Sequence, residues 1–598
     1  MSSLSSKSQN LREIKNILSK YWLTPIFIYF VVEIFRFLQR RVISRYPILH
    51  KFSYPKELKN LVKELNFGKK YAHDIKNSKT SPNKIFTIEL ITFKLNSEIK
   101  DIWKLSFDDN EEFLYLHRWH WLLNNSSIKE NNKEDLMIWG EYQIRSWIRF
   151  HKSNRKFPPM DAYSIGERIS NSLLFFRHCS GSWNNVPEDI KSNIAQMVSD
   201  LVTRIEYYPN DLGGNHVLNN ARAIILASYT IQNNKLLEVG KFILFERLKK
   251  IFDNHGFSRE GSSHYHFLLT RWLLEIRMAS VEFDDLDLVE KISVFINRAL
   301  KALEFFIVTT KKNVSFPLYG DISPDCPPEW LKNLIFSKLV GYSKHSNSSD
   351  WASLYKNFEL PKKYEQYEDK EITNNKDWTR VDFKGWNLII HHEDTNRKSI
   401  ASHAHSDFSA FVLYYQGKEL LIDPGRYSYS GSREGFSNEA SKSHNIINID
   451  MFPPSLSKGD RLIPKEYKDK KFSIKITKLK NKVLVTLEHT GFKRLKSKVN
   501  KHKRTFEIYE NKFVLMDNIS GDGIHLVEQF FHFGDELSNN NNNLFEKSFS
   551  SYPRLNRELI NLTSKRSNSY LHCKPYFFSS FSGRVKLPFK SNFQIRRI

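Results

Sequence analysis

Cysteine is scarce in this chain of 598 residues, which contains only Cys179, Cys326 and Cys573. The three lie far apart, their number is odd, and none forms a CxxC pair. Their spacing therefore excludes a disulfide framework and a metal site built from several thiolates. The cysteines leave the cellular compartment open.

Long apolar runs are also missing from the sequence. The most apolar stretch, residues 21–35, is short, contains Glu33 and is followed by a basic segment. A membrane-spanning helix needs about 20 apolar residues, and a signal peptide needs a short basic start and a small-residue cleavage site. We therefore expect a buried or interfacial amphipathic helix in residues 1–50. The alternatives are membrane association through residues 21–41 or an uncleaved signal.

Acidic residues are too few to balance the basic ones, because 66 Asp and Glu face 91 Lys and Arg, for a net charge of +25. This excess favours a polyanionic partner such as nucleic acid, an anionic membrane surface or an acidic polysaccharide. A general bias towards lysine and asparagine, as in the asparagine run at 539–543, explains the charge equally well. No helix-turn-helix, zinc-finger or RNA-binding signature is present, so we do not expect nucleic acid as the partner.

The spacing of apolar residues divides the chain into two kinds of structure. From about residue 10 to 360, apolar residues recur at helical spacing, and Pro or Gly separates the runs. After Trp378 the apolar period changes to two, and short turns join successive strands as hairpins. We expect a multidomain α+β protein with an N-terminal segment (1–50), an all-helical domain (51–370) and an antiparallel β-sandwich (371–598).

The densest group of chemically capable residues lies between residues 402 and 450. His403 and His405 are two positions apart, so on an extended segment both imidazoles would lie on one face. Asp423 follows an apolar hairpin, and His444 stands at the start of the next strand. His405, Asp423 and His444 offer nitrogen and oxygen ligands that suit Zn²⁺, which would leave His403 for chemistry.

A second candidate site precedes a strong helical run in the middle of the chain. Asn215 and His216 follow a Gly-Gly loop and stand directly before the helix. An amide and an imidazole at a helix N-terminus form an anion-binding corner. A plain helix cap is the simpler interpretation of Asn215 alone.

A third candidate site lies at the start of another helix. Tyr265 stands between His264 and His266 after a polar loop, an arrangement that is unusual for an interface. Further along, Tyr319 and Asp321 flank a turn, and we interpret both as mainly structural.

The order of these motifs resembles the heparinase II/III-like polysaccharide lyases. The matching motifs are, in chain order, GNH before a helix, a loop ending in SSHYH, PLYGD, HAHSD, LIDPGRYSY and SHN. The combination of HAHSD with a strand ending in DPG and a later SHN is the most specific. The resemblance covers most of the chain. It implies an incomplete α/α toroid followed by an antiparallel β-sandwich, in agreement with the change of apolar period.

The resemblance implies β-elimination on an acidic polysaccharide that contains uronic acid. By motif position, Asn215 and His216 would neutralise the substrate carboxylate. Tyr265 and His403 would act as acid and base. A tyrosine ionises near pH 10 and needs nearby positive charge to act as a base, so the substrate-contacting residues include possible sources of that charge. The implied substrate contacts are Arg259, His264, His266, Trp119 and Arg433.

The resemblance also implies a structural role for the proposed metal ligands. His405, Asp423 and His444 would hold a zinc ion that braces the wall between the domains, and no other cofactor is expected. The alternative function is non-catalytic acidic-glycan binding, or surface-polysaccharide assembly, on the same scaffold. The family favours the cell envelope or periplasm, but the lack of a clear cleavable signal leaves the cytoplasm open. The substrate sugar and the oligomeric state are also left open.

Overall fold

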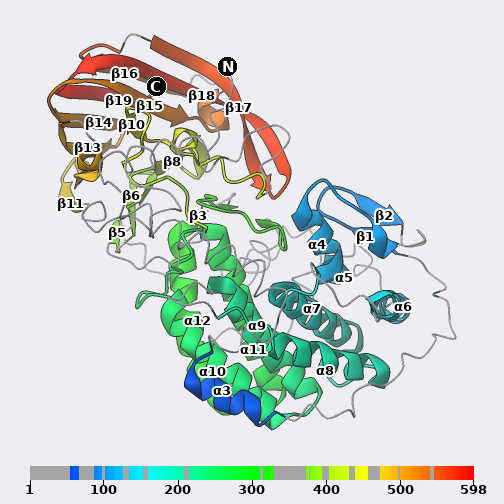
Figure 1. The fold of residues 1–598 in the computed structure, drawn as a ribbon. Helices are drawn as coiled ribbons and strands as arrows, with labels where there is room; N and C mark the ends of the chain where they lie inside the picture. Colours follow the sequence, from blue (N-terminus) through cyan, green and yellow to red (C-terminus); the bar gives the residue numbers. More distant parts are fainter. Residues whose placement is uncertain are drawn as a thin grey trace, which may run out of the picture.

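The computed structural model contains a helical region followed by a sheet-rich region (Figure 1). Three expectations lie outside the described residues: the helix within 1–50 with its segment 21–41, the boundary at 370, and Arg433. Within the described part of the chain, no helix is long and apolar enough to cross a membrane. The described residues are 54–65, 82, 86–96, 102–124, 133–151, 159–207, 214–309, 314–328, 372–375, 377–392, 403–429, 438, 440–454, 472–495, 498–538, 544–555 and 557–598.

The N-terminal region is built from packed helices around one apolar core. Side-chain caps begin several of them, because Asp161, Asn233, Ser262 and Asp285 each accept a backbone N–H of the first turn. The helices are α3 (Lys56–Lys63), α4 (Asn110–Arg118), α5 (Trp121–Asn124), α6 (Lys133–His151), α7 (Ala162–Ser180), α8 (Glu188–Val202), α9 (Gly214–Thr230), α10 (Asn234–Ile251), α11 (Ser263–Glu282) and α12 (Leu286–Phe306). Two short hairpins accompany them, β1 (Thr87–Glu89) with β2 (Lys94–Asn96) and β3 (Val308–Thr309) with β4 (Val314–Ser315).

The sequence around Trp119 reads as one helix but forms two. Helix α4 ends at Arg118 because Trp119 takes a left-handed backbone conformation, with φ of 62°. Helix α5 begins two residues later. The break turns the indole of Trp119 into the core, where its ring centroid lies 5.2 Å from that of Trp147.

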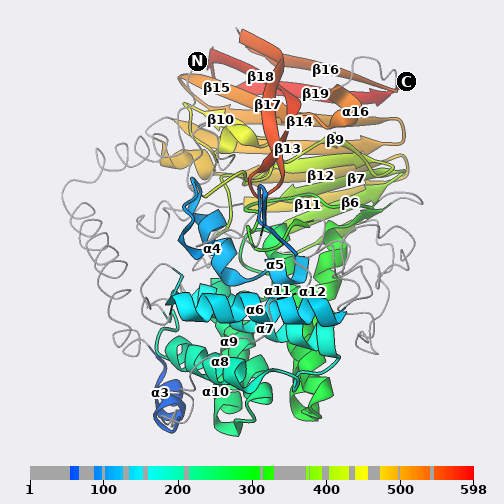
Figure 2. The same cartoon turned by 90° about the vertical axis from the view of Figure 1, so that its right-hand side faces the viewer.

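Within its described residues, the C-terminal region forms three antiparallel sheets (Figure 2). The five-stranded sheet has the order β5-β6-β7-β8-β9, the six-stranded sheet β11-β12-β13-β14-β19-β16, and the four-stranded sheet β10-β15-β18-β17. The strands are β5 (Ile372–Asn374), β6 (Trp378–Phe383), β7 (Trp386–His391), β8 (Phe411–Tyr415), β9 (Lys418–Leu421), β10 (Ile447–Ile449), β11 (Phe472–Leu479), β12 (Lys482–His489), β13 (Val499–Tyr509), β14 (Lys512–Gly521), β15 (Ile524–His532), β16 (Phe545–Tyr552), β17 (Arg557–Ser569), β18 (His572–Lys586) and β19 (Phe589–Arg597).

The period of two in the sequence produces the sandwich core. In β12, Val483, Val485 and Leu487 are buried, while the residues between them are partly exposed. These side chains join one core with apolar residues of the other two sheets. A bridge between Leu421 and Phe533 links the five-stranded and four-stranded sheets. The predicted class, helices first and an antiparallel sandwich second, is confirmed.

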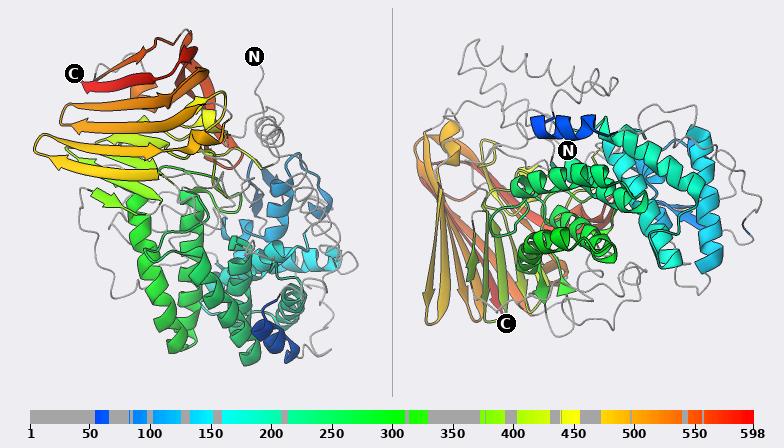
Figure 3. Two further views of the ribbon diagram at one scale, coloured as in Figure 1. Left: turned by 60° about the vertical axis from the view of Figure 1, so that its left-hand side comes forward. Right: turned by 90° about the horizontal axis from the view of Figure 1, so that it is seen from below.

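Among the described residues, the helical region contacts the sandwich at several places, and two of these contacts lie outside the candidate site (Figure 3). At the first, Phe306 at the end of α12 packs against Trp378 of β6, and Arg380 donates hydrogen bonds to the carbonyls of Phe305 and Ile307. At the second, the long β17–β18 hairpin reaches α4 and the β1–β2 hairpin (Figure 1). There His572 Nε2 lies 2.6 Å from the carbonyl oxygen of Ile91. The candidate residues lie between these two contacts.

Candidate active site

Asp321 binds three side chains of the C-terminal region. Its carboxylate accepts hydrogen bonds from His403 Nδ1 (2.8 Å) and His405 Nε2 (3.0 Å). Nη1 of Arg426 donates to the same carboxylate at 2.7 Å. Asp321 is 1% exposed, so these contacts form away from water. An ionised carboxylate only accepts, so Asp321 places a proton on Nδ1 of His403 and leaves Nε2 for other partners.

The HAHSD motif lies in a loop before β8 and not on a strand. His403 and His405 nevertheless reach the two different oxygens of Asp321. The two rings therefore point in a shared direction, as expected. The cause differs from the expectation, because both rings contact the Asp321 carboxylate of the helical region and do not lie on one face of a strand.

Tyr265 brings the first turn of α11 into the same group. Ser262 caps this helix and accepts the backbone N–H of Tyr265 at 3.1 Å. The Tyr265 ring stacks on His403, with 3.6 Å between centroids and 12° between planes. Its hydroxyl oxygen lies 2.7 Å from that of Tyr429. Burial raises the pKa of Tyr265 well above its ordinary value.

Two glycines allow the loops of the site to meet backbone to backbone. Gly261 and Gly320 have φ of 74° and 72°, in the left-handed region that favours glycine. A Cβ on Gly261 would lie 2.5 Å from Ala404 Cβ, and one on Gly320 would lie 2.6 Å from the carbonyl oxygen of His403. Any larger residue at either position would push the loop of His403 away from the helical region.

Asn215 and His216 lie in the first turn of α9, which begins at Gly214, so both stand inside the helix and not directly before it as expected. Asn215 is 4% exposed, whereas the side chain of His216 is 46% exposed. His216 Nδ1 lies 2.6 Å from Oε2 of Glu206, and its ring centroid lies 4.6 Å from that of Tyr163. Burial opposes the ionisation of His216, but the Glu206 carboxylate outweighs it and raises the pKa of His216.

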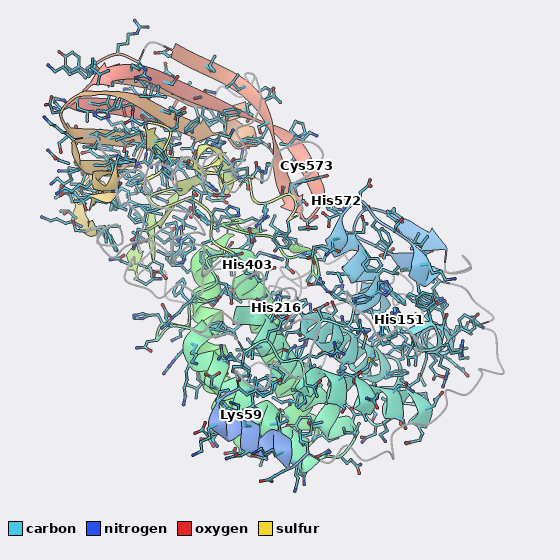
Figure 4. The ribbon with its side chains drawn as sticks, in the orientation of Figure 1. Lys59, His151, His216, His403, His572 and Cys573 are labelled. Atoms are coloured by element: carbon cyan, nitrogen blue, oxygen red, sulfur yellow. The ribbon has the colours of Figure 1, made fainter. Side chains whose placement is uncertain are left out.

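Glu260 lies between the start of α9 and His403. A Cβ on Gly214 would stand 2.8 Å from Glu260 Oε1, so this carboxylate lies against the first residue of the helix. On the other side, Glu260 Oε2 is 3.9 Å from His403 Nε2. Figure 4 places His216 and His403 where the helical region faces the sandwich. Glu260 thus lies between the first residue of α9 and His403, which stacks on Tyr265, and the inclusion of Asn215 and His216 in the same group stays a prediction.

The predicted metal ligands form a second, buried group beside the first. One ligand atom from each of His405, Asp423 and His444 lies within 4.8 Å of the others. Within the described residues, Nδ1 of His405 and Nε2 of His444 have no hydrogen-bond partner. The other ring nitrogens are held by carboxylates, His405 by Asp321 and His444 by Asp423 at 2.7 Å. Two unpartnered imidazole nitrogens beside a carboxylate fit the preferences of Zn²⁺.

His264 and His266 do not supply positive charge to Tyr265. His264 Nδ1 accepts the N–H of Ser323, and His266 Nδ1 accepts that of Ser258. Burial lowers the pKa of His264 to about 3 and that of His266 to about 4. Both rings are therefore neutral at neutral pH, and the expectation that they contribute charge is wrong. Both side chains are buried, and their direct contact with a substrate stays a prediction.

Of the remaining substrate contacts expected from the sequence, one is wrong. Trp119 is 1% exposed and belongs to the helical core, so its ring cannot stack on a sugar. Arg259 is partly exposed, and its role stays a prediction. Arg433 lies outside the described residues.

Sequence reasoning missed several residues of the group. Asp321 was interpreted as structural, and Glu260, Arg426 and Tyr429 received no role. The available signal was their membership of the motif segments PLYGD and LIDPGRYSY and of the loop before SSHYH. Their chemistry depends on contacts between segments that are far apart in the chain.

Comparisons with known proteins match both regions. Residues 374–571 match the family model described as Heparinase II/III-like, C-terminal. The crystal structure of heparinase III superposes with a TM-score of 0.61 at 16% identity, covering 84% of this chain and 81% of that chain. A heparan sulfate lyase HepC mutant from Pedobacter heparinus gives a TM-score of 0.51 at 14% identity, covering 91% and 83%. No curated protein gives a significant match.

The two kinds of match support each other. The structural matches have low identity, so they establish the fold of the whole chain and no more. The family model matches by sequence, and its range includes the loops of His403, Asp423 and His444. By sequence, residues 374–571 are therefore similar to the heparinase II/III-like family in its C-terminal domain, and the chain as a whole shares the fold of the solved heparinase III structure.

Proposed function

We propose that this protein is a polysaccharide lyase that cleaves a uronic-acid-containing polysaccharide by β-elimination. The observation that carries the proposal is the stack of His403 on Tyr265, with Asp321 holding His403 Nδ1. Two acid–base side chains from different regions meet there in a buried setting. The similar structures, heparinase III and a heparan sulfate lyase, support the same reaction class.

The reaction first requires that the substrate carboxylate be neutralised. The proton on C5 is weakly acidic because the adjacent carboxylate resists a second negative charge. Asn215 and His216, at the N-terminus of α9, would bind that carboxylate. The raised pKa of His216 favours its charged form, which suits an anionic ligand.

Proton transfer would then involve Tyr265 and His403. The ionised hydroxyl of Tyr265 takes the C5 proton, and the electrons of that C–H bond form the C4=C5 double bond. The C4–O4 bond breaks, and O4 receives a proton from Nε2 of the His403 imidazolium or from the newly protonated Tyr265. Asp321 stabilises the charged ring of His403 through Nδ1.

A bound zinc ion would belong to the structural part of this scheme. His405, Asp423 and His444 would hold it, and its charge would fix the loops that carry His405 and His444. Because Asp321 binds both His405 and His403, it would connect that site to the acid–base group.

The test is incubation of the purified protein with a panel of acidic polysaccharides, including capsular polysaccharides of the source cell. A lyase yields unsaturated uronate ends, which are detected by their ultraviolet absorbance and by mass. Tyr265→Phe and His403→Ala should abolish product formation from a substrate that the wild type cleaves. Tyr509→Phe, at the end of β13 in the six-stranded sheet, should not. Binding without product from any glycan would instead support the non-catalytic alternative.

A further inference from the structure

A second tyrosine meets Tyr265 across the boundary between the two regions. The hydroxyl oxygens of Tyr265 and Tyr429 are 2.7 Å apart. The Tyr429 hydroxyl also lies 3.3 Å from the carbonyl oxygen of Ile322. The first distance is typical of a good hydrogen bond between hydroxyls, and the second is long. The contact with Tyr265 is therefore the main interaction of this hydroxyl.

Tyr429 is held in place by a bracket formed by Asp109, Ser428 and Tyr570. The backbone N–H of Tyr429 donates to the hydroxyl of Tyr570 at 2.8 Å. Tyr570 stands in the turn between β17 and β18, and its hydroxyl lies 3.4 Å from both carboxylate oxygens of Asp109. Ser428 Oγ donates to the same carboxylate at 2.8 Å. Asp109 also caps α4, so the bracket ties the Tyr429 loop to the helical region.

The guanidinium of Arg426 packs against the face of the Tyr429 ring. The guanidinium carbon of Arg426 lies 4.5 Å from the ring centroid, within the range of a cation–π contact. Arg426 is itself bound to Asp321. The position of the Tyr429 hydroxyl is thus set by its backbone and by its ring before any substrate binds.

We propose that Tyr429 is a positioning residue for Tyr265, and that its hydroxyl donates a hydrogen bond to the ionised oxygen of Tyr265. This inference rests on the proposed function, in which Tyr265 takes a proton from the substrate. When Tyr265 is ionised, its oxygen only accepts, so the 2.7 Å contact must have Tyr429 as donor. Hydrogen bonds to charged oxygens are the strong ones.

The surroundings of Tyr265 explain why it needs such a donor. Burial raises the pKa of Tyr265, and the carboxylates of Asp321, Asp325 and Glu111 raise it further, while the hydrogen bond with Tyr429 lowers it. Neutral His264 offers no compensating charge. Among the described residues, His403 and Tyr163 are two further titratable groups that interact with Tyr265.

The first test is the pH dependence of Tyr429→Phe in the full-length protein. The variant keeps the ring and its contact with Arg426 but loses the donor. We expect kcat near neutral pH to fall about tenfold to a hundredfold, with little change in KM. The loss should shrink as pH rises, because the rising limb of the rate profile follows Tyr265 to higher pH. A loss that is the same at every pH, or no loss, overturns the inference. Tyr509→Phe is the matched control.

A second test needs no substrate. Difluorotyrosine at position 265 reports its own ionisation through the fluorine NMR shift. Its titration midpoint should lie at higher pH in the Tyr429→Phe background than in the otherwise unchanged protein. Equal midpoints overturn the inference. A wild-type protein that cleaves no glycan would defeat the proposed function alone, because this titration still decides the role of Tyr429.

Discussion

Replacing Asp321 by asparagine removes the acceptor on which three side chains converge. Asn has nearly the same shape, but it offers one acceptor oxygen and adds two donor hydrogens. The donors of His403, His405 and Arg426 already point at this position, so either one of them faces another donor or His403 moves its proton to Nε2. Removing one partner of a buried ion pair costs about 3–5 kcal/mol. We expect the free energy of unfolding to fall near the lower end of that range, because one acceptor remains.

The effect on catalysis should be larger than the effect on stability. Asp321 selects the ring nitrogen of His403 that carries the proton, and its loss leaves that choice open. General acid–base catalysis is worth about 10²–10⁴-fold in rate, so Asp321→Asn should lower kcat by a factor in this range. KM should change less, because Asn215 and His216 lie on another element. Unsaturated product is measured where urea denaturation shows the variant to be folded.

A buried aspartate elsewhere in the sandwich provides the matched control. Asp517 accepts hydrogen bonds from His502, Arg504 and Gln529, and it is fully buried like Asp321. Asp517→Asn should lose a similar amount of stability, yet its folded fraction should keep most of its kcat. Equal losses of kcat in Asp321→Asn and Asp517→Asn, or wild-type kcat in Asp321→Asn, would refute the role assigned to Asp321.

Three further predictions concern the metal group, the charged histidine and a glycine contact. Unchelated wild-type protein should contain a stoichiometric divalent metal by elemental analysis and His405→Ala should lose it; metal-free wild type would contradict the ligand assignment. Because Glu206 raises the pKa of His216, this pair contributes its whole share of the free energy of unfolding below about pH 6.5. That contribution is lost as the pH rises through the raised pKa of His216 in the folded protein. Glu206→Gln should remove that pH dependence of unfolding and raise KM at neutral pH, and an unchanged KM would argue against His216 as a carboxylate ligand. Gly320→Ala should lower the free energy of unfolding by more than the roughly 1–2 kcal/mol that a left-handed alanine costs, because the new Cβ would lie 2.4 Å from a carbonyl oxygen. Gly181 has a similar φ but open space around it, so Gly181→Ala should lower the free energy of unfolding, measured by urea denaturation, by only that amount.

The sequence predicted those features that depend on local spacing. The change from a helical period to a period of two correctly separated the helices from the sandwich. The two-residue spacing predicted a shared direction for the rings of His403 and His405, but the motif forms a loop, and both rings meet because they contact Asp321. Asn215 and Tyr265 could be found because each stands at a helix start, where side chains point out of the first turn.

Features that depend on docking could not be predicted in this way. Asp321 lies about eighty residues from His403, and nothing in its own segment indicates that three donors will surround it. Trp119 belongs to an aromatic-rich run whose pattern fits a core or a sugar platform equally well, and the left-handed turn that decides between them is not visible in the spacing. His264 and His266 lie in a polar segment, but backbone N–H groups bury and neutralise them.

The hydrogen bond between Asp109 and Tyr570 has a consequence for how the protein is made. The two residues are 461 positions apart in the chain. During synthesis, the helical region emerges and folds well before the β17–β18 hairpin leaves the ribosome. Until that hairpin arrives, Tyr570 cannot hold the Tyr429 loop against α4. We therefore expect the nascent chain to remain inactive until the β17–β18 hairpin has been synthesised and has docked on α4, so that the arrival of this hairpin switches on the site.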